Sequence, residues 1–345
     1  MQDITGIEEI TPTWLTEAFQ KAGHLTSGSI ENVVFQSDSD IPVGTPKIYK
    51  AVIAYSKDAV CDIPSDIIFK FALQEKEYYF YESIAKLLPQ RFVPNCYLAL
   101  QNVGKSQSLL LIENLSKTHT QTEWPVVPNF NDCKQAVEKL ATLHAYWWNR
   151  PDLDTDLLPM LTHGNYWSGR LAEAVEKLPA FLDFIGDRLS SARRKMYEKV
   201  LNSSNLFWRP ECFRFSRTFL HGDAHFWNFL FPNHKSQAGI QIIDWNSWDI
   251  GRGTNDLAYM IGLHWYPGLR QQSEKSLLKI YHETITNAGI SYSWDECWLD
   301  YRESNIMNLF IPIWQWQRNS PAMVWWSHLE RSHLTFDDLD CEELL

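Results

Sequence analysis

The sequence predicts an α+β protein with two lobes: a small N-terminal lobe built on an antiparallel sheet, and a larger, mainly helical C-terminal lobe. Apolar segments with strand character gather in the first third of the chain, whereas helical periodicity dominates the rest. The length of 345 residues is sufficient for two lobes and a sizeable core.

The expected elements follow in chain order. A helix begins near Thr11, with Pro12 in its first turn, and ends at Gly23. Strands of the first lobe are predicted at 30–36, 48–55, 66–73 and 108–115. Helices of the larger lobe are predicted at 133–148, near 171–188 and 190–201, and through the Trp-rich stretch 274–345.

The charge balance excludes some classes of partner. The chain has 42 Asp and Glu against 31 Lys and Arg, a formal net charge of −11, which argues against nucleic-acid or anionic-membrane binding and leaves room for a cationic partner. No apolar run approaches the ~20 residues of a membrane span, and the N-terminus lacks signal-peptide character, so we expect a cytoplasmic protein. The six scattered cysteines form no Cys-x-x-Cys and indicate neither zinc nor a disulfide framework.

Polar residues crowd into one short stretch between apolar flanks. His221, Asp223, His225 and Asn228 lie within eight positions, and Asp244 follows a second apolar run. In a protein-kinase catalytic loop, an Asp accepts the substrate proton and an Asn five residues later holds magnesium, while a later Asp after a strand also holds magnesium. Asp223, Asn228 and Asp244 occur in this order and spacing.

Two short strands are predicted between the last two of these residues. The segments 229–231 and 241–243 surround a turn at 232–239 and should pair as a hairpin. Such a hairpin would return Asp244 beside Asn228, so that one magnesium ion could contact both.

The motif His-Gly-Asp-x-His-x-x-Asn at 221–228 resembles the signature of the aminoglycoside phosphotransferase and choline kinase-like family, small-molecule kinases with a two-lobed, protein-kinase-like fold. The segments 143–148, 243–245 and 255–259 further resemble its ecdysteroid kinase-like branch. The resemblance covers roughly residues 11–260. It implies that ATP or GTP is bound between the lobes and that its γ-phosphoryl group passes, with Mg²⁺, to a hydroxyl of a small metabolite, natural product or antibiotic.

The resemblance also implies roles for single residues. Asp223 would be the catalytic base, and Asn228 and Asp244 the metal ligands. Lys70 lies in an apolar strand, where a lysine needs an anionic partner. The nucleotide phosphates and Glu77 would supply it, although Glu82 is an alternative partner.

The predicted strand 108–115 resembles the hinge of the family. We expect the hinge near 112–116, with Glu113 and Leu115 at the nucleobase, a nucleotide-binding lobe at 1–115 and a catalytic lobe at 116–345. The loop expected over the phosphates, near 37–44, has only one glycine, Gly44, and therefore departs from the usual glycine-rich pattern.

The remaining polar and aromatic residues receive secondary predictions. We interpret His221 and His225 as residues that brace the loop by hydrogen bonds. Trp248 and Asp249 are candidates for the acceptor side, with Asp249 equally consistent with a turn. Two further residues are expected to be structural: His144 in the core of its helix, and Asp256 as the N-cap of a helix at 257–263.

Two other functions fit parts of the pattern. A non-catalytic nucleotide- or ligand-binding module on the same fold would explain the poor phosphate loop. A metal-dependent hydrolase would use the His and Asp cluster, but it has no need for Lys70. The sequence leaves the acceptor, the choice of ATP or GTP, and the oligomeric state open.

Overall fold

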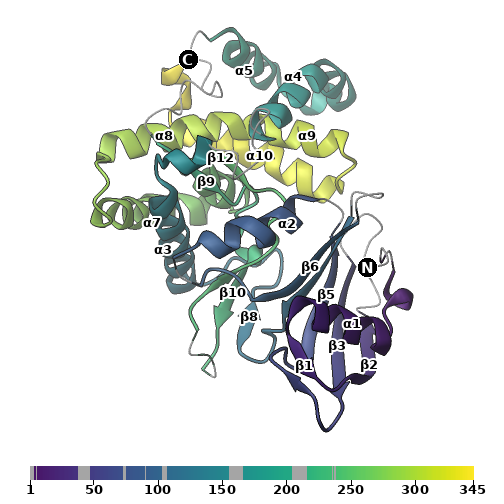
Figure 1. Cartoon of the computed structure of the whole chain (residues 1–345). Helices are drawn as coiled ribbons and strands as arrows, with labels where there is room; N and C mark the ends of the chain where they lie inside the picture. Colours follow the sequence, from purple (N-terminus) through teal and green to yellow (C-terminus); the bar gives the residue numbers. More distant parts are fainter. Residues whose placement is uncertain are drawn as a thin grey trace. The chain divides into compact units, whose positions relative to one another are not determined.

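The structure is a computed structural model whose chain forms two compact units (Figure 1). Unit 1 comprises Met1–Thr120 and Leu230–Asn246, and unit 2 comprises Gln121–Phe229 and Ser247–Leu345. The lobe boundary near residue 115 stays a prediction. The structure describes residue 4 and residues 6–37, 47–72, 75–89, 91–102, 107–154, 166–203, 216–234, 236 and 238–345.

Unit 1 is built on a five-stranded antiparallel sheet (Figure 1). Four strands match predicted segments to within two residues, whereas β6 was not predicted from the sequence. The order across the sheet is β2 (Ile30–Ser37), β3 (Lys47–Tyr55), β5 (Asp66–Ala72), β7 (Gln107–Glu113) and β6 (Cys96–Asn102).

One face of this sheet is covered by the helix α1 (Pro12–Ala22). Thr11 caps the helix by accepting a hydrogen bond from the amide of Trp14, and Gly23 ends it in the left-handed conformation, as the sequence predicts. Phe19 of the helix and Phe69 of β5 are fully buried in the same apolar cluster. Because side chains alternate along a strand, Lys70 lies on the opposite face.

Smaller elements complete unit 1. The predicted hairpin is present: β10 (Phe229–Pro232), which starts directly after Asn228, pairs with β11 (Gln241–Ile242) in a three-stranded sheet with β8 (His119–Gln121). The other elements are the strand pair β1 (Leu25–Ser27) and β4 (Val60–Cys61), the short helix α2 (Glu75–Tyr79), a π-helical turn at Phe80–Ile84, and 3-10 turns at Ile7–Glu9 and Ala85–Leu87.

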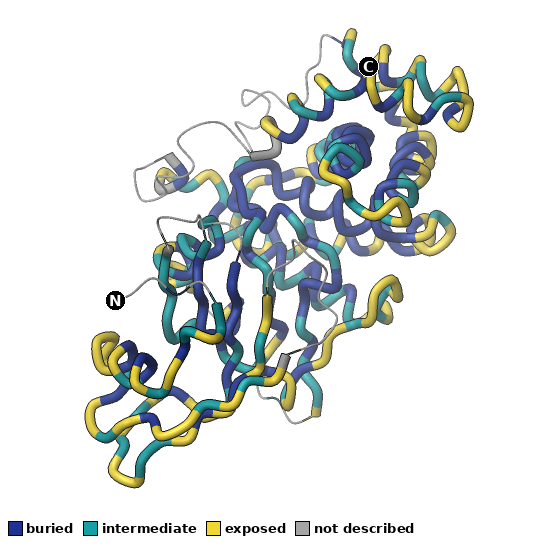
Figure 2. The backbone as a smooth tube through the Cα atoms, turned by 90° about the vertical axis from the view of Figure 1, so that its right-hand side faces the viewer, coloured by how far each residue is buried: buried dark blue, intermediate teal, exposed yellow. Residues whose placement is uncertain are grey.

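Unit 2 is mainly helical, and its described residues include one strand pair, β9 (Arg217–Leu220) and β12 (Asp249–Arg252). In each unit, buried segments run through the interior and exposed residues lie on outer helices and turns (Figure 2). No helix of the described residues is long and apolar enough to cross a membrane. The longer helices are α3 (Phe130–Trp147), α4 (Tyr166–Ile185), α5 (Ser191–Asn202), α7 (Pro267–Asn287), α8 (Trp294–Met307), α9 (Ile311–Gln317) and α10 (Ala322–Asp338).

The short helix α6 (Thr254–Leu257) corrects one prediction. Asp256 lies inside this helix, which continues as a π-helical turn at Ala258–Leu263, so it is not an N-cap. Its carboxylate is fully buried and accepts hydrogen bonds from a loop more than thirty positions earlier. A capping residue satisfies its own helix, whereas this side chain serves another segment.

Candidate active site

In unit 1, Lys70 forms a buried ion cluster. Its ammonium lies 2.8 Å from the carboxylate of Glu77 in α2 and 2.7 Å from Oδ1 of Asp244. Glu82, the alternative partner, instead contacts Lys86 at the surface. Burial alone would lower the pKa of Lys70, but the two carboxylates raise it above its ordinary value, so the lysine is charged at neutral pH.

The backbone around Asp244 is fixed by aromatic packing. Trp245 stacks on Phe80 with a ring-centroid distance of 4.1 Å and an interplanar angle of 4°, and its indole nitrogen donates to the carbonyl of Ile242. Asp244 itself has φ +66°, a left-handed conformation that is costly for a residue with a side chain. The packing of Trp245 therefore holds the carboxylate of Asp244 toward Lys70.

The predicted hinge residues have internal partners. The carboxylate of Glu113 pairs with Arg91 and accepts a hydrogen bond from the amide of Asn95 at 3.1 Å. The carbonyl of Leu115 accepts from the amides of Thr118 and His119. Any contact of residues 113–115 with a nucleobase would therefore use backbone groups other than this carbonyl. The loop predicted over the phosphates, including Gly44, lies outside the described residues.

In unit 2, Asp223 lies in a tight polar loop. The side-chain nitrogen of Asn228 donates to the backbone carbonyl of Asp223 at 2.9 Å, and the amide of Asp223 donates to Nδ1 of His221 at 3.3 Å. His225 Nε2 lies 3.6 Å from Oδ2 of Asp223 and 3.4 Å from the amide nitrogen of Asn228. The side chain of Tyr259 is also hydrogen-bonded to Asp223.

Asp256 stabilises the backbone of this loop. Its carboxylate accepts the backbone N–H groups of His221 at 2.7 Å and Gly222 at 2.9 Å. His144 Nε2 lies 3.2 Å from the same carboxylate. Because a carboxylate can only accept, His144 donates there and accepts from the hydroxyl of Tyr281 through Nδ1.

The loop also requires a glycine at position 222. Gly222 has φ +77°, and a Cβ there would lie 2.0 Å from the carbonyl oxygen of Ser247, so only glycine fits.

The three acids of this region differ in exposure. The side chain of Asp223 is 25% exposed, whereas Asp249 is 2% exposed and Asp256 is fully buried. Asp249 is the first residue of β12, pairs with Leu220 of β9, and accepts a hydrogen bond from the amide of Ile250. Trp248, also named for the acceptor side, is buried and stacks on Phe219. Of the three acids, Asp223 is the one that a ligand can reach.

A cationic side chain that sequence reasoning missed lies near this loop. Arg170 of α4 is 8% exposed, donates to the hydroxyl of Ser247 at 3.3 Å, and lies 4.2 Å from the ring centroid of Trp314. Its sequence neighbours give no signal of this role, because an arginine on an amphipathic helix usually faces solvent. For Asp256, an acid followed by an apolar run was a signal of burial, although we interpreted it as a cap.

Three histidines line another side of the loop. His264 lies with its ring centroid 5.3 Å from that of His225 and 4.6 Å from that of His328. Burial lowers the pKa of His328 to about 3 and that of His264 well below its ordinary value, so both are neutral at pH 7. Among the described residues, no group of three or more His, Cys, Asp or Glu side chains is arranged to hold a metal ion by itself.

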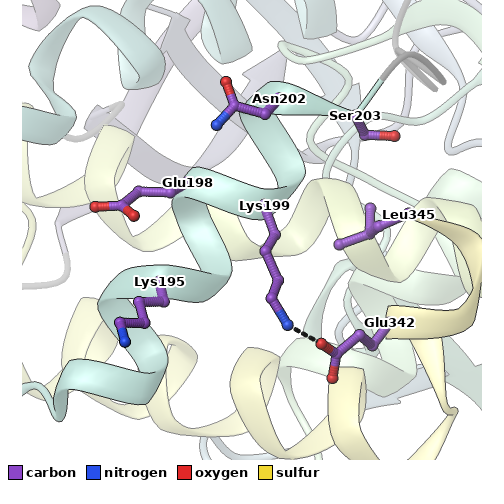
Figure 3. A pocket seen from close by; sticks show the side chains of 7 residues that line it. All are labelled: Lys195, Glu198, Lys199, Asn202, Ser203, Glu342 and Leu345. Carbon is purple, nitrogen blue, oxygen red and sulfur yellow. Dashed lines mark hydrogen bonds and ion pairs between the residues drawn. The ribbon is translucent and has the colours of Figure 1, made fainter.

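A separate groove of about 570 Å³ lies along α5 and the C-terminal residues (Figure 3). Its lining is of mixed charge, and Lys199 points to Glu342, with which it forms an ion pair. None of the predicted site residues lines it.

Comparison with solved structures identifies the fold. The chain matches an aminoglycoside phosphotransferase-type protein from Ralstonia eutropha with a TM-score of 0.61 and 12% identity over 96% of this chain and 97% of the other. It matches Plasmodium vivax ethanolamine kinase with a TM-score of 0.56 and 12% identity, covering 89% and 81%. A thermostable aminoglycoside phosphotransferase APH(4)-Ia in complex with ADP and hygromycin B gives 0.52 and 10%, covering 94% and 98%. The fold is thus the α+β, two-lobed fold of the protein-kinase-like phosphotransferases, as predicted.

Sequence comparison defines the family. The profile of the ecdysteroid kinase-like family matches residues 62–289, more than half of the chain. The protein belongs to the ecdysteroid kinase-like family, which confirms the resemblance inferred from the motifs. Curated proteins give no match in sequence.

Proposed function

We propose that the protein transfers the γ-phosphoryl group of ATP or GTP to a hydroxyl of a small molecule, with Asp223 as the general base. The observation that carries this proposal is the state of Asp223: a partly exposed carboxylate in a loop that Asp256 holds by buried hydrogen bonds and Asn228 by a partly buried one. A base must be reachable by the acceptor and fixed in place, and Asp223 meets both requirements.

Lys70 supplies the positive charge for the nucleotide phosphates in this proposal. It is charged, buried and held by Glu77 and Asp244, an arrangement that suits a point charge for phosphate. The same sheet face carries exposed apolar side chains: Ile48 pairs with Lys70 in register, and Val52 lies four residues further along β3 and is half exposed. These apolar residues suit packing against a nucleobase ring, with the backbone of residues 113–115 at its polar edge.

Asn228 and Asp244 fit a magnesium ion by the chemistry of their donors. Both offer side-chain oxygens, and the hydrogen bond from the nitrogen of Asn228 to Asp223 leaves its amide oxygen as the atom suited to a hard cation. Two protein ligands suffice, because Mg²⁺ keeps water and phosphate oxygens as further ligands. Bound there, the ion would neutralise charge on the transferring phosphoryl group. His221 and His225 brace the loop by hydrogen bonds. Trp248 and Asp249 are buried, so they would support the acceptor side without contacting the acceptor.

The proposal also covers the cellular compartment, the co-substrate and the division into lobes. All five described cysteines have free thiols, which suits the reducing cytoplasm. The structure of a related fold with ADP and hygromycin B supports a nucleotide co-substrate and a small-molecule acceptor. In this proposal, residues 1–115 form the nucleotide-binding lobe and residues 116–345 form the catalytic lobe.

The test is mass spectrometry of a mixed acceptor panel incubated with the protein, Mg²⁺ and either ATP or GTP. We expect an acceptor to gain the mass of one phosphoryl group. In Asp223→Asn, the rate of this phosphorylation should fall by roughly 10²–10⁴-fold. Nucleotide affinity, measured by displacement of a fluorescent analogue, should change less than about twofold in the same variant, because Asp223 does not hold the phosphates. Absence of nucleotide binding in the wild-type protein would contradict the proposal and favour a non-catalytic module.

A further inference from the structure

The hydrogen bonds that hold the loop of Asp223 continue beyond Asp256 to a tyrosine on the helix α7. The hydroxyl of Tyr281 lies 3.0 Å from Nδ1 of His144, and Nε2 of His144 lies 3.2 Å from the carboxylate of Asp256. The side chains of Tyr281, His144 and Asp256 are all fully buried. Tyr281 therefore cannot be reached by a ligand, and any effect on the reaction must pass through its partners.

The chemistry of the groups fixes the direction of this chain of hydrogen bonds. The carboxylate of Asp256 can only accept, so His144 donates to it through Nε2 and keeps Nδ1 as an acceptor. The phenol of Tyr281 keeps its proton, because burial raises its pKa well above the ordinary value, and it donates to Nδ1. At the other end, Asp256 accepts the backbone N–H groups of the two residues directly before Asp223.

The far end of the chain fits closely against a glycine. A Cβ at Gly253 would lie 2.1 Å from the hydroxyl oxygen of Tyr281 and 2.8 Å from Nδ1 of His144, so a larger residue would displace both groups. Gly253 directly precedes α6, the helix that carries Asp256. The backbone of His144 is held as well, because its carbonyl accepts from the hydroxyl of Thr218 at 2.7 Å. The imidazole therefore has a fixed backbone and a hydrogen bond at each ring nitrogen.

We propose that Tyr281 is a positioning residue for the base: its hydroxyl holds the imidazole of His144 against Asp256, and Asp256 holds the backbone that carries Asp223. The proposal rests on the proposed kinase function and extends it from the loop to α7. Without the hydroxyl, Nδ1 of His144 would be a buried acceptor with no donor, which is unfavourable. A shift of the ring that relieved this would weaken its contact with Asp256 and loosen the loop.

Kinetics with the acceptor that the panel identifies test this role. Tyr281→Phe keeps the aromatic ring and its packing and removes the hydroxyl alone. We expect kcat to fall by roughly tenfold, because a small displacement of the base slows the reaction, while KM for nucleotide and for acceptor changes less than about twofold. Gly253→Ala displaces the same hydroxyl while Tyr281 is kept, and it should lower kcat in the same way.

Tyr197→Phe is the matched control. Tyr197 is also fully buried, and its hydroxyl donates to the backbone carbonyl of Leu309 at 3.0 Å, so the variant loses a comparable hydrogen bond elsewhere in unit 2. It should lose about as much stability to urea as Tyr281→Phe, while its kcat stays close to that of the wild-type protein. In a His144→Leu background, Tyr281→Phe should have no further effect on kcat, because the connection is already broken.

Hydrogen exchange measures the same connection without turnover. The backbone N–H groups of His221 and Gly222 should exchange roughly tenfold faster in Tyr281→Phe than in Tyr197→Phe, because their acceptor Asp256 is less firmly held. Equal exchange in the two variants, equal kcat, or a KM that rises as much as kcat falls would overturn the role of Tyr281 and leave the kinase function standing. Absence of phosphoryl transfer by the wild-type protein with every acceptor would instead overturn the kinase function, and with it the base that Tyr281 is proposed to position.

Discussion

The two units hold their predicted site residues in opposite ways. In unit 1, Lys70 is buried between two carboxylates, Glu77 and Asp244, and the cluster is stable because opposite charges meet. In unit 2, the carboxylate of Asp223 has neutral hydrogen-bonding neighbours, and the buried charge of Asp256 acts on the backbone of the loop instead. The residues of unit 1 depend on ion pairing, whereas those of unit 2 depend on a rigid loop.

This difference separates stability from activity. Removing one member of a buried ion pair leaves its partner charged and unsolvated, so changes at Lys70 should destabilise the fold. Removing the charge of Asp223 should leave most of the loop intact, because its hydrogen bonds to His221 and the shorter of its two to Asn228 use backbone atoms of Asp223. Asp256 lies between these cases, since it is buried and also positions the base.

Lys70→Met should have the largest effect on stability. It leaves the carboxylate of Glu77, which is 1% exposed, without its cation, and we expect a loss of about 3–5 kcal/mol in the free energy of unfolding by urea. The double variant Lys70→Met/Glu77→Met should recover most of this loss, because it removes both buried charges. Nucleotide binding should be lost in both variants.

The control for this comparison is Lys86→Met. Lys86 pairs with Glu82 at 3.2 Å on the surface, where an ion pair contributes about 0–1 kcal/mol, so the variant should unfold like the wild type. A double variant at 70 and 77 that is no more stable than Lys70→Met alone would show that the cluster is not held by pairing.

Asp256→Asn should affect both properties more moderately. The amide has only one oxygen to replace two carboxylate oxygens that accept the N–H groups of His221 and Gly222, and charged hydrogen bonds of this kind contribute about 1.5–3 kcal/mol. We expect a loss of about 2 kcal/mol in stability and a fall of more than tenfold in kcat, with KM for the nucleotide unchanged. Asp337→Asn, at an exposed pair with Arg193, is the control. Unchanged kcat in Asp256→Asn would show that loop position does not limit the reaction.

The sequence was sufficient for the parts of this protein that depend on local pattern. The signals lie within a few residues at Thr11, at Gly23 and in the apolar run of β5, and the fold follows from them and from the family motif. Glu77 could not be separated from Glu82 by spacing, because the choice depends on how α2 packs beside β5. Asp256 and Arg170 act on a loop reached only through the tertiary fold, 33 and 53 positions from Asp223, and no local pattern encodes such a contact.

The last expected effect leaves activity at neutral pH unchanged and appears only as the pH falls. It is a pH dependence of stability in unit 2, where the histidines beside the Asp223 loop are neutral at pH 7. His328 is 4% exposed, donates to Gln315 through Nδ1, and has its pKa lowered by burial to about 3. Between pH 6.5 and about 3 the unfolded chain binds more protons at this residue than the folded one, so its contribution to stability is complete above pH 6.5 and is lost as the pH falls. Lys70 stays charged throughout this range and contributes no such dependence.

His328→Asn keeps a donor for Gln315 but cannot titrate. From pH 7.5 to pH 5, urea unfolding of the wild-type protein should lose about 2 kcal/mol more than the variant, because 1.5 pH units below the ordinary pKa correspond to about 1.36 kcal/mol each. The pKa of His264 is lowered in both proteins, first of all by burial, so its contribution largely cancels in the difference, although His328 adds to the shift in the wild type. An equal loss in both would mean that His328 takes up a proton without disturbing the packing against His264, and that the surroundings of Asp223 tolerate a second cation beside Arg170.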